Sequence, residues 1–346
     1  MGRETTRRPW RRVVRAAPLL ALLGAGALAA AAAPAGAQLP RVLVITTGGT
    51  ISLSGQELVD AIPQLGEIAQ IQVEQFVRFG SSSMTPEHWV GLSRRINEAF
   101  AADPGLAGVI LTHGTDTMEE TAYFLHLTVK DERPVVVTGA MRGPTAVSAD
   151  GPANVVAAAR VAVAPEARGQ GVLVVLNDWI HSARDVRKMD SNRVDTFQSE
   201  WGPVGLVDSD RVLIHRRIVT RHTTDSELAL PTDSLGEVPI VADYAGSDGS
   251  MIRALVARGV DGIVVQAFAN GRASPGTTAA MREAAEAGIP VALASRVPEG
   301  RVMDPQSRGM VIAVGDLPPH KARVLLMLAL VRTKDAEELM RIFRTY

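Results

Sequence analysis

Threonine hydroxyls gather at two places in the chain, each directly after a short apolar run. Residues 46–51 (TTGGTI) place two glycines between threonines, and residues 112–118 (THGTDTM) place threonines around a histidine and an aspartate. A hydroxyl becomes a useful nucleophile only when a nearby base accepts its proton. The two segments are therefore candidate sites for nucleophilic catalysis, provided that the fold supplies a base.

Each segment also has a structural interpretation. A glycine-rich turn after a first strand is most often structural, and neither a GxxxxGK[ST] nor a GxGxxG pattern points to a nucleotide phosphate. In the second segment one hydroxyl would suffice to cap a helix, so three threonines and an aspartate exceed that need. His113 and Thr117 are best explained as satisfied structural groups, which leaves Thr115 and Asp116 as functional candidates.

Lys188 is the candidate base. It lies in residues 184–188 (RDVRK), beyond the apolar run 171–176 and at the same end of a parallel sheet as the threonines. A lysine acts as a base only where burial or neighbouring charge favours its neutral form, and a lysine in a charged loop is ordinarily solvated. The residues alone therefore predict a hydroxyl-rich site in an α/β protein, without assigning a reaction.

The elements that must position these residues alternate along the chain. Short β-branched runs, typical of strands buried on both faces, are separated by longer segments with helical spacing. This alternation predicts a mostly parallel sheet with helices on both faces, and ligands of such sheets bind beyond the carboxyl ends of the strands. The expected strands are 41–46, 108–112, 134–138 and 171–176, and the expected helices are 86–103, 118–129 and 151–163.

A polar stretch without periodicity, residues 217–236, predicts a linker between two domains. We expect an N-terminal catalytic α/β domain at 38–216 and a smaller C-terminal α/β domain at 237–346. The apolar block within 321–332 is too short to cross a membrane. The strands expected in the second domain are 239–244, 262–266, 290–294 and 309–314, and the expected helices are 251–259, 277–288, 321–332 and 335–343.

Residues 1–37 are predicted to be a secretory signal peptide. Six arginines precede an alanine-rich run at 16–33, and residues 35–37 (AGA) supply the small residues of a cleavage site. A permanent anchor would need about 20 strongly apolar residues, whereas this run is mostly alanine. We therefore expect a periplasmic or secreted protein with no membrane association after cleavage, exported by either the general or the twin-arginine route.

The composition of the mature chain excludes several classes. Without its first 37 residues the net charge changes from −1 to about −6, and no basic cluster remains, which argues against nucleic acid as a partner. The chain has no cysteine, so it has neither a lipoprotein attachment site nor a disulfide framework. No cofactor and no metal site are expected.

From residue 41 to residue 346 the sequence resembles the bacterial type II L-asparaginases. Residues 47–52 (TGGTIS) fit the first signature of that family, and residues 108–118 (GVILTHGTDTM) fit its second. The resemblance implies a hydrolase that converts L-asparagine into L-aspartate and ammonia, with L-glutamine as a poorer substrate. Further matching stretches are 118–124 (MEETAYF), 148–152 (SADGP), 184–186 (RDV), 295–298 (SRVP) and 321–326 (KARVLL).

The resemblance also implies a role for each matching residue. Thr50 corresponds to the primary nucleophile. Thr115, Lys188 and Asp116 correspond to a triad in which the lysine takes the threonine proton and the aspartate supports the lysine and the substrate ammonium. The family suggests a homotetramer built as a dimer of dimers. The implied substrate-binding residues are Ser81 for the α-carboxylate, Ser82 where a glutamine is common, the Ala140 carbonyl for the leaving amide nitrogen, and Asn270 from a neighbouring subunit.

Two departures from the family lie at one corner of its site. The family usually has a long mobile loop after the first signature, with a tyrosine beside the nucleophile, whereas no tyrosine lies between Thr50 and residues 63–65 (PQL) here. Residues 298–309 are also a few positions short of the usual length. Glu299 is the nearest residue to a supporting glutamate of the family, but it is not an assignable counterpart. We interpret the two departures as the loss of a lid.

Three functions are compatible with the sequence. An asparaginase is favoured by both signatures. A degenerate relative that binds asparagine or aspartate without efficient turnover is favoured by the missing tyrosine, but it has no need of two nucleophile-capable threonines and a base. The amidotransferase subunit that shares this fold and acts on aminoacylated tRNA is opposed by the signal peptide, the acidic mature chain and the absence of an extra N-terminal module.

Overall fold

The computed structural model describes residues 38–48, 56–230 and 234–346. Residues Leu39–Tyr346 form one compact unit. The predicted signal peptide at 1–37 and the predicted nucleophile Thr50 lie outside the described residues.

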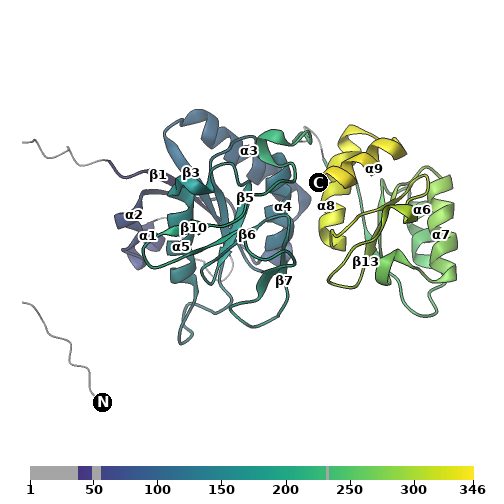
Figure 1. The fold of residues 1–346 in the computed structure, drawn as a ribbon, viewed down its shortest axis with the longest axis horizontal. Coiled ribbons are helices and arrows are strands. Elements are labelled where there is room, and N and C mark those ends of the chain that lie inside the picture. Colours follow the sequence, from purple (N-terminus) through teal and green to yellow (C-terminus); the bar gives the residue numbers. More distant parts are fainter. Residues whose placement is uncertain (1–37, 49–55, 231–233) are drawn as a thin grey trace, which may run out of the picture. The chain divides into compact units, whose positions relative to one another are not determined.

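An eight-stranded mixed sheet organises the N-terminal half (Figure 1). Its order is β10-β9-β6-β5-β4-β3-β1-β2, in which β1 to β5 pair in parallel and β6, β9 and β10 extend the sheet with antiparallel pairs. β7 (Val186–Lys188) and β8 (Phe197–Ser199) form a separate two-stranded sheet. The strands of the large sheet are β1 (Arg41–Thr46), β2 (Gln70–Gln75), β3 (Leu106–Thr112), β4 (Val135–Thr138), β5 (Val172–Leu176), β6 (Trp179–Ser182), β9 (Gly205–Val207) and β10 (Val212–Ile214).

Helices cover both faces of the large sheet. Successive side chains of a strand point to opposite faces, so Val42 and Val44 of β1 join the apolar cluster under α5, whereas Leu43 and Ile45 join the cluster under α3 and α4. This burial on both sides explains the near-continuous apolar runs in the sequence. The helices are α1 (Gln56–Ala61), α2 (Leu65–Ile68), α3 (Pro86–Ala102), α4 (Met118–Thr128) and α5 (Gly151–Val163).

A four-stranded parallel sheet, in the order β11-β12-β13-β14, organises the C-terminal part. Phe124 and Leu127 of α4 lie in one apolar cluster with Leu325 and Leu328 of α8, and α4 and α8 lie side by side in Figure 1. The elements are β11 (Ile240–Ala242), β12 (Ile263–Ala267), β13 (Val291–Ser295), β14 (Val311–Ala313), α6 (Ser250–Arg258), α7 (Pro275–Glu286), α8 (Pro319–Arg332) and α9 (Ala336–Thr345).

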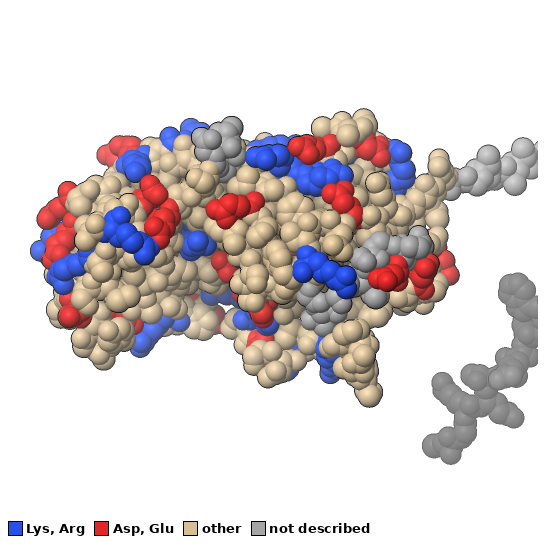
Figure 2. All heavy atoms as spheres, turned by 180° about the vertical axis from the view of Figure 1, so that it is seen from behind, with Lys and Arg blue, Asp and Glu red and all other residues tan. Residues whose placement is uncertain are grey.

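The predicted fold class is confirmed: a large, mostly parallel N-terminal sheet is followed by a smaller α/β unit. The exact domain boundaries at 216 and 237 stay predictions. Among the described residues no helix is long and apolar enough to cross a membrane. Basic and acidic side chains are interspersed over the face shown in Figure 2.

Buried histidines should make the fold sensitive to acid. Burial lowers the pKa of His181 to about 4, whereas an unfolded histidine titrates near 6.5. The unfolded chain therefore binds more protons than the folded one between these values, so stability is full above pH ~6.5 and falls as the pH drops towards ~4. At pH ~5 the loss from this one residue is about 2 kcal/mol.

Urea unfolding at pH 7 and pH 5 measures this loss. The His181→Asn variant cannot titrate, but it keeps an acceptor near Nδ1, which lies 2.9 Å from Ser199 Oγ. The difference in unfolding free energy between the two pH values should be smaller in the variant. An identical difference in both proteins would show that His181 does not titrate in this range.

Candidate active site

The end of β1, which precedes the predicted nucleophile in the sequence, is fixed against the end of β3. The Thr47 N–H and hydroxyl both donate to the Thr112 carbonyl, at 3.1 and 2.9 Å. Gly48 has φ of 86°, and a Cβ there would lie 2.7 Å from the Phe79 nitrogen. Only glycine allows this backbone conformation and approach without strain. The first signature therefore begins packed against the segment that leads to Ser81.

Ser81 lies against the second signature. The Asp116 N–H donates to Ser81 Oγ (3.2 Å), and the Thr117 hydroxyl donates to the Ser81 carbonyl (2.8 Å). A Cβ on Gly114 would lie 2.6 Å from Ser81 Oγ, so the two segments are in direct contact. Ser81 is buried, whereas the next residue, Ser82, is exposed.

Lys188 reaches the same turn from β7. Its Nζ donates to Thr115 Oγ1 at 2.9 Å and to Asp116 Oδ1 at 3.1 Å. The Lys188 side chain is 18% exposed and that of Asp116 is 68% exposed, so the amine is held inside the site while the carboxylate faces solvent. The structure thus brings Thr115, Asp116 and Lys188 together, although they are more than 70 positions apart in the sequence.

This arrangement can perform nucleophilic chemistry. A neutral lysine amine at hydrogen-bond distance from a hydroxyl can accept its proton, and a third group that orients the base completes such a unit. Thr115, Lys188 and Asp116 have the geometry for the three parts. After proton transfer, the ammonium would be stabilised by the Asp116 carboxylate beside it.

The chain after β4 passes against the Thr115 turn. A Cβ on Gly139 would lie 2.4 Å from the His113 carbonyl and 3.5 Å from Thr115 Cγ2. The next residue, Ala140, is buried. Ala140, whose carbonyl is the predicted acceptor for the leaving amide nitrogen, therefore directly follows a residue that packs against the Thr115 turn.

Comparison with known proteins decides the family. Residues 41–220 match the family model described as asparaginase, N-terminal, and residues 237–343 match the glutaminase/asparaginase C-terminal domain. The chain belongs to the asparaginase family.

Individual relatives agree with this membership. The chain is 39% identical over 328 residues to L-asparaginase 2 of Bacillus subtilis, covering 89% of this chain and 87% of the relative. It is also 39% identical over 332 residues to a probable periplasmic L-asparaginase of Haemophilus influenzae, covering 90% and 94%. The crystal structure of a probable cytoplasmic L-asparaginase from Campylobacter jejuni matches with a TM-score of 0.84 and 39% identity, covering 90% of this chain and all of that one.

His113 of this asparaginase-family protein has structural partners. Burial lowers its pKa to about 4, so the ring is neutral. Nδ1 lies 2.7 Å from the Gly114 carbonyl, and Nε2 lies 3.0 Å from the Thr121 hydroxyl. The carbonyl can only accept, so Nδ1 donates to it and Nε2 accepts from Thr121. His113 therefore fixes the turn before Thr115.

Asn270 lies in the C-terminal part, after β12. It adopts a left-handed conformation (φ 56°), and its buried Oδ1 has no hydrogen-bond partner in the described chain. No hydrogen bond joins Asn270 to Lys188, Thr115 or Asp116 within the part of this chain that the structure describes. Its predicted role in a neighbouring subunit's site stays a prediction.

Glu119 is a neighbour of the site that no catalytic motif in the sequence indicates. Its Oε1 accepts from the Lys188 N–H (3.3 Å), and its Oε2 lies 2.9 Å from His320 Nε2. Burial opposes ionisation of this carboxyl, but His320, Lys321 and the Lys188 N–H together outweigh that effect and lower its pKa. The only signal for Glu119 in the sequence was its place in the matching stretch 118–124. Nothing in that stretch reveals that its side chain is buried.

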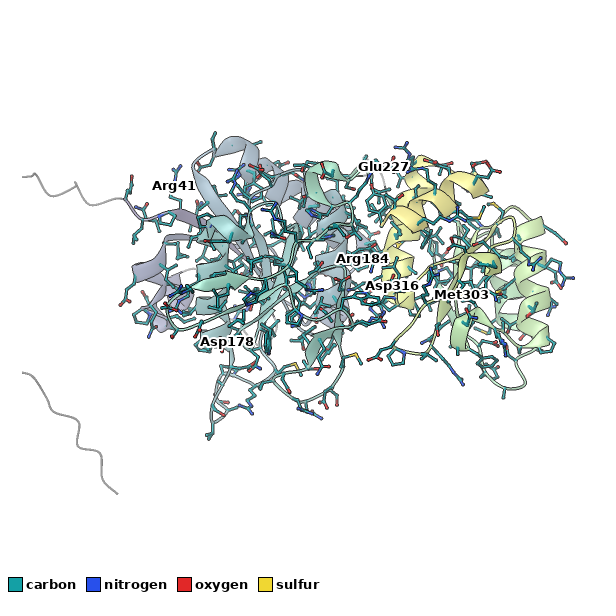
Figure 3. All side chains as sticks on the ribbon, viewed as in Figure 1. Arg41, Asp178, Arg184, Glu227, Met303 and Asp316 are labelled. Carbon is teal, nitrogen blue, oxygen red and sulfur yellow. The ribbon has the colours of Figure 1, made fainter. Side chains whose placement is uncertain are left out.

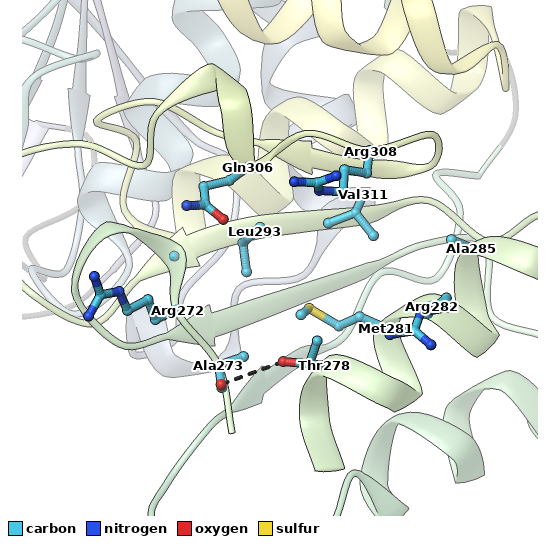
Figure 4. Close-up of a pocket in the computed structure, with 11 residues that line it drawn as sticks. Arg272, Ala273, Thr278, Met281, Arg282, Ala285, Leu293, Gln306, Arg308 and Val311 are labelled. Atoms are coloured by element: carbon cyan, nitrogen blue, oxygen red, sulfur yellow. Dashed lines mark hydrogen bonds between the residues drawn. The ribbon is translucent and has the colours of Figure 1, made fainter. Parts of the chain in front are cut away.

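A hollow of about 690 Å³ lies elsewhere, on the C-terminal sheet (Figure 4). Its lining, which includes Gly271, offers no base beside a nucleophile, so it is not a candidate for the hydrolytic site. In the described chain no cluster of three or more histidine, aspartate or glutamate residues could hold a metal. The other residues that line the hollow are Arg272, Ala273, Thr278, Met281, Arg282, Ala285, Leu293, Gln306, Arg308 and Val311.

Proposed function

We propose that this protein hydrolyses L-asparagine to L-aspartate and ammonia, with L-glutamine as a poorer substrate. One observation carries the proposal: Lys188 Nζ lies 2.9 Å from Thr115 Oγ1 and 3.1 Å from Asp116 Oδ1. Thr115 and Asp116 lie just beyond the carboxyl end of the parallel strand β3, where such sheets bind ligands, and Lys188 reaches them from β7. Family membership supplies the substrate class, since relatives of similar sequence are named asparaginases.

The proposed reaction proceeds through a threonine ester. A threonine hydroxyl, that of Thr50 in the first step, loses its proton to a base and attacks the side-chain amide carbon of the substrate. Backbone N–H groups stabilise the oxyanion. The carbon–nitrogen bond then breaks, the leaving nitrogen takes up a proton, and ammonia departs. Water attacks the ester, which releases aspartate and restores the threonine.

The substrate contacts follow the family assignment. Ser81 would bind the α-carboxylate, with Ser82 beside it, and the Ala140 carbonyl would accept from the leaving amide nitrogen. Asp116 would bind the substrate ammonium. Support for this placement comes from the packing of Ser81 against Gly114 and of Gly139 against Thr115, which brings all of these segments to one turn.

A second candidate is a degenerate relative that binds asparagine or aspartate and turns it over inefficiently. The absence of tyrosine between Thr50 and residue 63 favours it. The hydrogen-bonded Thr115–Lys188 pair opposes it, because a binding protein gains nothing from a base aimed at a hydroxyl.

Ammonia release from asparagine and glutamine by the purified mature protein tests the proposal. The Lys188→Met and Thr50→Ala variants, assayed beside it, exclude a contaminating enzyme. We expect release from asparagine to exceed release from glutamine, and both variants to be nearly inactive. Tight asparagine binding without ammonia release would favour the degenerate relative instead.

We further propose a homotetramer in which Asn270 completes a neighbour's site. The left-handed backbone of Asn270 (φ 56°), a conformation that often marks functional turns, supports this role. Light scattering at the assay concentration should therefore detect a dimer or a larger assembly. An active monomer would remove Asn270 from the site.

The protein is proposed to act in the periplasm or outside the cell. The arginine-rich, alanine-rich leader supports export, and one relative of similar sequence is named as periplasmic. N-terminal sequencing of the protein from the producing cell should begin at Gln38. Retention of residues 1–37 would contradict export by cleavage.

A further inference from the structure

Lys321, in the first turn of α8, is completely buried. Its Nζ donates three hydrogen bonds, to the carbonyls of Ala183 (2.8 Å), Arg184 (2.8 Å) and Val186 (2.5 Å). No carboxylate of the described chain lies within ion-pair distance of this amine. All of its hydrogen bonds are therefore made to the backbone segment that leads into Lys188.

The large sheet holds that segment only at its start, where the Ala183 N–H donates to the Val172 carbonyl of β5 (3.0 Å). β7 is only three residues long and pairs with β8 alone, outside the large sheet. Lys188 is its last residue. A small shift of the β7 backbone would therefore move the Lys188 amine away from Thr115 and Asp116.

The C-terminal part holds the same segment at further points. Arg184 pairs with Asp316 through two hydrogen bonds of 2.9 and 2.7 Å, and the two residues lie side by side in Figure 3. Arg187 donates to the Asp316 carbonyl at 2.6 Å. These contacts hold side chains, whereas those of Lys321 hold the backbone itself.

The neighbour of Lys321 in α8 acts on Lys188 by a second route. His320 Nε2 lies 2.9 Å from Glu119 Oε2, and Glu119 Oε1 accepts from the Lys188 N–H. The first turn of α8 therefore contacts both the backbone before Lys188 and the carboxylate that holds the Lys188 N–H.

Stability alone does not account for a lysine at this position. Burial lowers the pKa of Lys321 to about 7, which shows that its charge is poorly accommodated. A buried charge is unfavourable unless hydrogen bonds compensate it, and for Lys321 those partners are the three carbonyls of residues 183–186. The hydrogen bonds to residues 183–186, the segment that leads into β7, distinguish this lysine from a methionine or leucine.

We propose that Lys321 is a positioning residue for Lys188. Its three hydrogen bonds fix the backbone of residues 183–186, and this sets the distance from the Lys188 amine to Thr115 and Asp116. The inference rests on the proposed function, in which Lys188 is the base. Through Lys321, the C-terminal part controls the geometry of a catalytic group in the N-terminal part.

The Lys321→Met variant tests this inference. Methionine is unbranched and of similar length, but it cannot donate hydrogen bonds. We expect kcat for asparagine to fall by about 10- to 100-fold, because misplacement of a catalytic group by about 1 Å has effects of this order. KM should change by less than about threefold, since the proposed substrate contacts lie on other segments.

Arg323→Met is the matched control. Arg323 lies two residues further along α8, is partly rather than completely buried, and donates to the Val238 carbonyl at 2.7 Å. It does not contact the β7 segment through that bond. Its replacement removes a cation and a backbone hydrogen bond from the same helix, so kcat should stay unchanged.

A double-mutant cycle separates positioning from a general structural role. If Lys321 acts through Lys188, then Lys321→Met causes no further loss of the residual rate in a Lys188→Met background. An equal loss in both backgrounds would overturn the inference, as would a Lys321→Met variant with the wild-type kcat.

A wild-type protein that hydrolyses neither amide would contradict the proposed function alone. Crystal structures of the wild-type and Lys321→Met proteins then test positioning without activity. Lys188 Nζ should leave hydrogen-bond distance of Thr115 Oγ1 in the variant. An unchanged contact would overturn the inference.

Discussion

Replacing Thr115 with valine is expected to lower kcat for asparagine by about 10³-fold or more. Valine keeps the shape of threonine but removes the hydroxyl that Lys188 contacts at 2.9 Å. The lysine then loses the group with which it exchanges a proton, while the helix and strand on either side are unaffected. Steady-state kinetics and thermal unfolding, measured on the same preparation, check the two parts of this expectation.

Thr112→Val is the matched control for this substitution. Thr112 lies in the same segment, and its buried hydroxyl has no hydrogen-bond partner in the described part of the chain. The same chemical change should therefore leave kcat near the wild-type value. If both variants lose activity equally, then the hydroxyl of Thr115 has no special role.

Lys188→Met should lose at least about 10²-fold in kcat, as expected for the removal of a general base. Residues that act as one unit give losses that do not add. Thr115→Val and Lys188→Met combined should therefore be scarcely worse than the more severe single variant. If the losses in kcat were additive in free energy, the two residues would act independently.

The sequence predicted the sheet where the strands are buried on both faces. β1 was predicted with its observed bounds, and β3, β4 and β5 to within two residues, because their apolar runs are continuous. The edge strand β2 (Gln70–Gln75) was missed, since it alternates polar residues with Ile71 and Val73 and has no such run. The short strands β6, β9 and β10 were missed for a related reason. A strand of three or four residues is too short to show a recognisable apolar pattern.

The site could be predicted only in part. Because ligands bind beyond the strand ends of a parallel sheet, the sequence alone pointed to the segment of Thr115 and Asp116. Lys188 looked like a solvated lysine in a charged loop, and its contacts depend on the packing of β7. Glu119 and Lys321 were not singled out, because a charged residue is assumed to be exposed until tertiary structure shows its burial.

None of the chain's three tyrosines, Tyr123, Tyr244 and Tyr346, lies between Thr50 and Gln56, where the resemblance leads us to expect one. Tyr123 is buried and donates to the main-chain oxygen of Tyr346, while the Tyr346 hydroxyl accepts from the Glu227 N–H. Tyr244 follows β11 in the C-terminal part. Helix α1 already begins at Gln56, so only residues 49–55 separate it from Gly48.

Asparagine turnover by the unmodified protein is therefore expected to be real but slow, with kcat lower by about 10² or more than in loop-bearing relatives. A tyrosine that helps to activate the nucleophile is worth 10²–10⁴ as a general base. Closure of a lid also strengthens every polar interaction in the site by excluding water. Residues 51–62 contain no tyrosine, so we expect Lys188 to be the principal base and product release not to wait for a lid. Side-by-side assays with a loop-bearing family member measure the difference.

Grafting a tyrosine-bearing loop between Ile51 and Gln56 separates the two contributions. The same loop with phenylalanine at the tyrosine position restores closure without the hydroxyl. We expect the tyrosine graft to raise kcat well above that of the phenylalanine graft, and the phenylalanine graft to give at most a modest gain. The shortened segment 298–309 must support the new loop, so its usual length should be restored in both grafts. Ordinary family-level turnover by the unmodified protein would refute this account, because it would mean that neither the tyrosine nor the lid is needed on this scaffold.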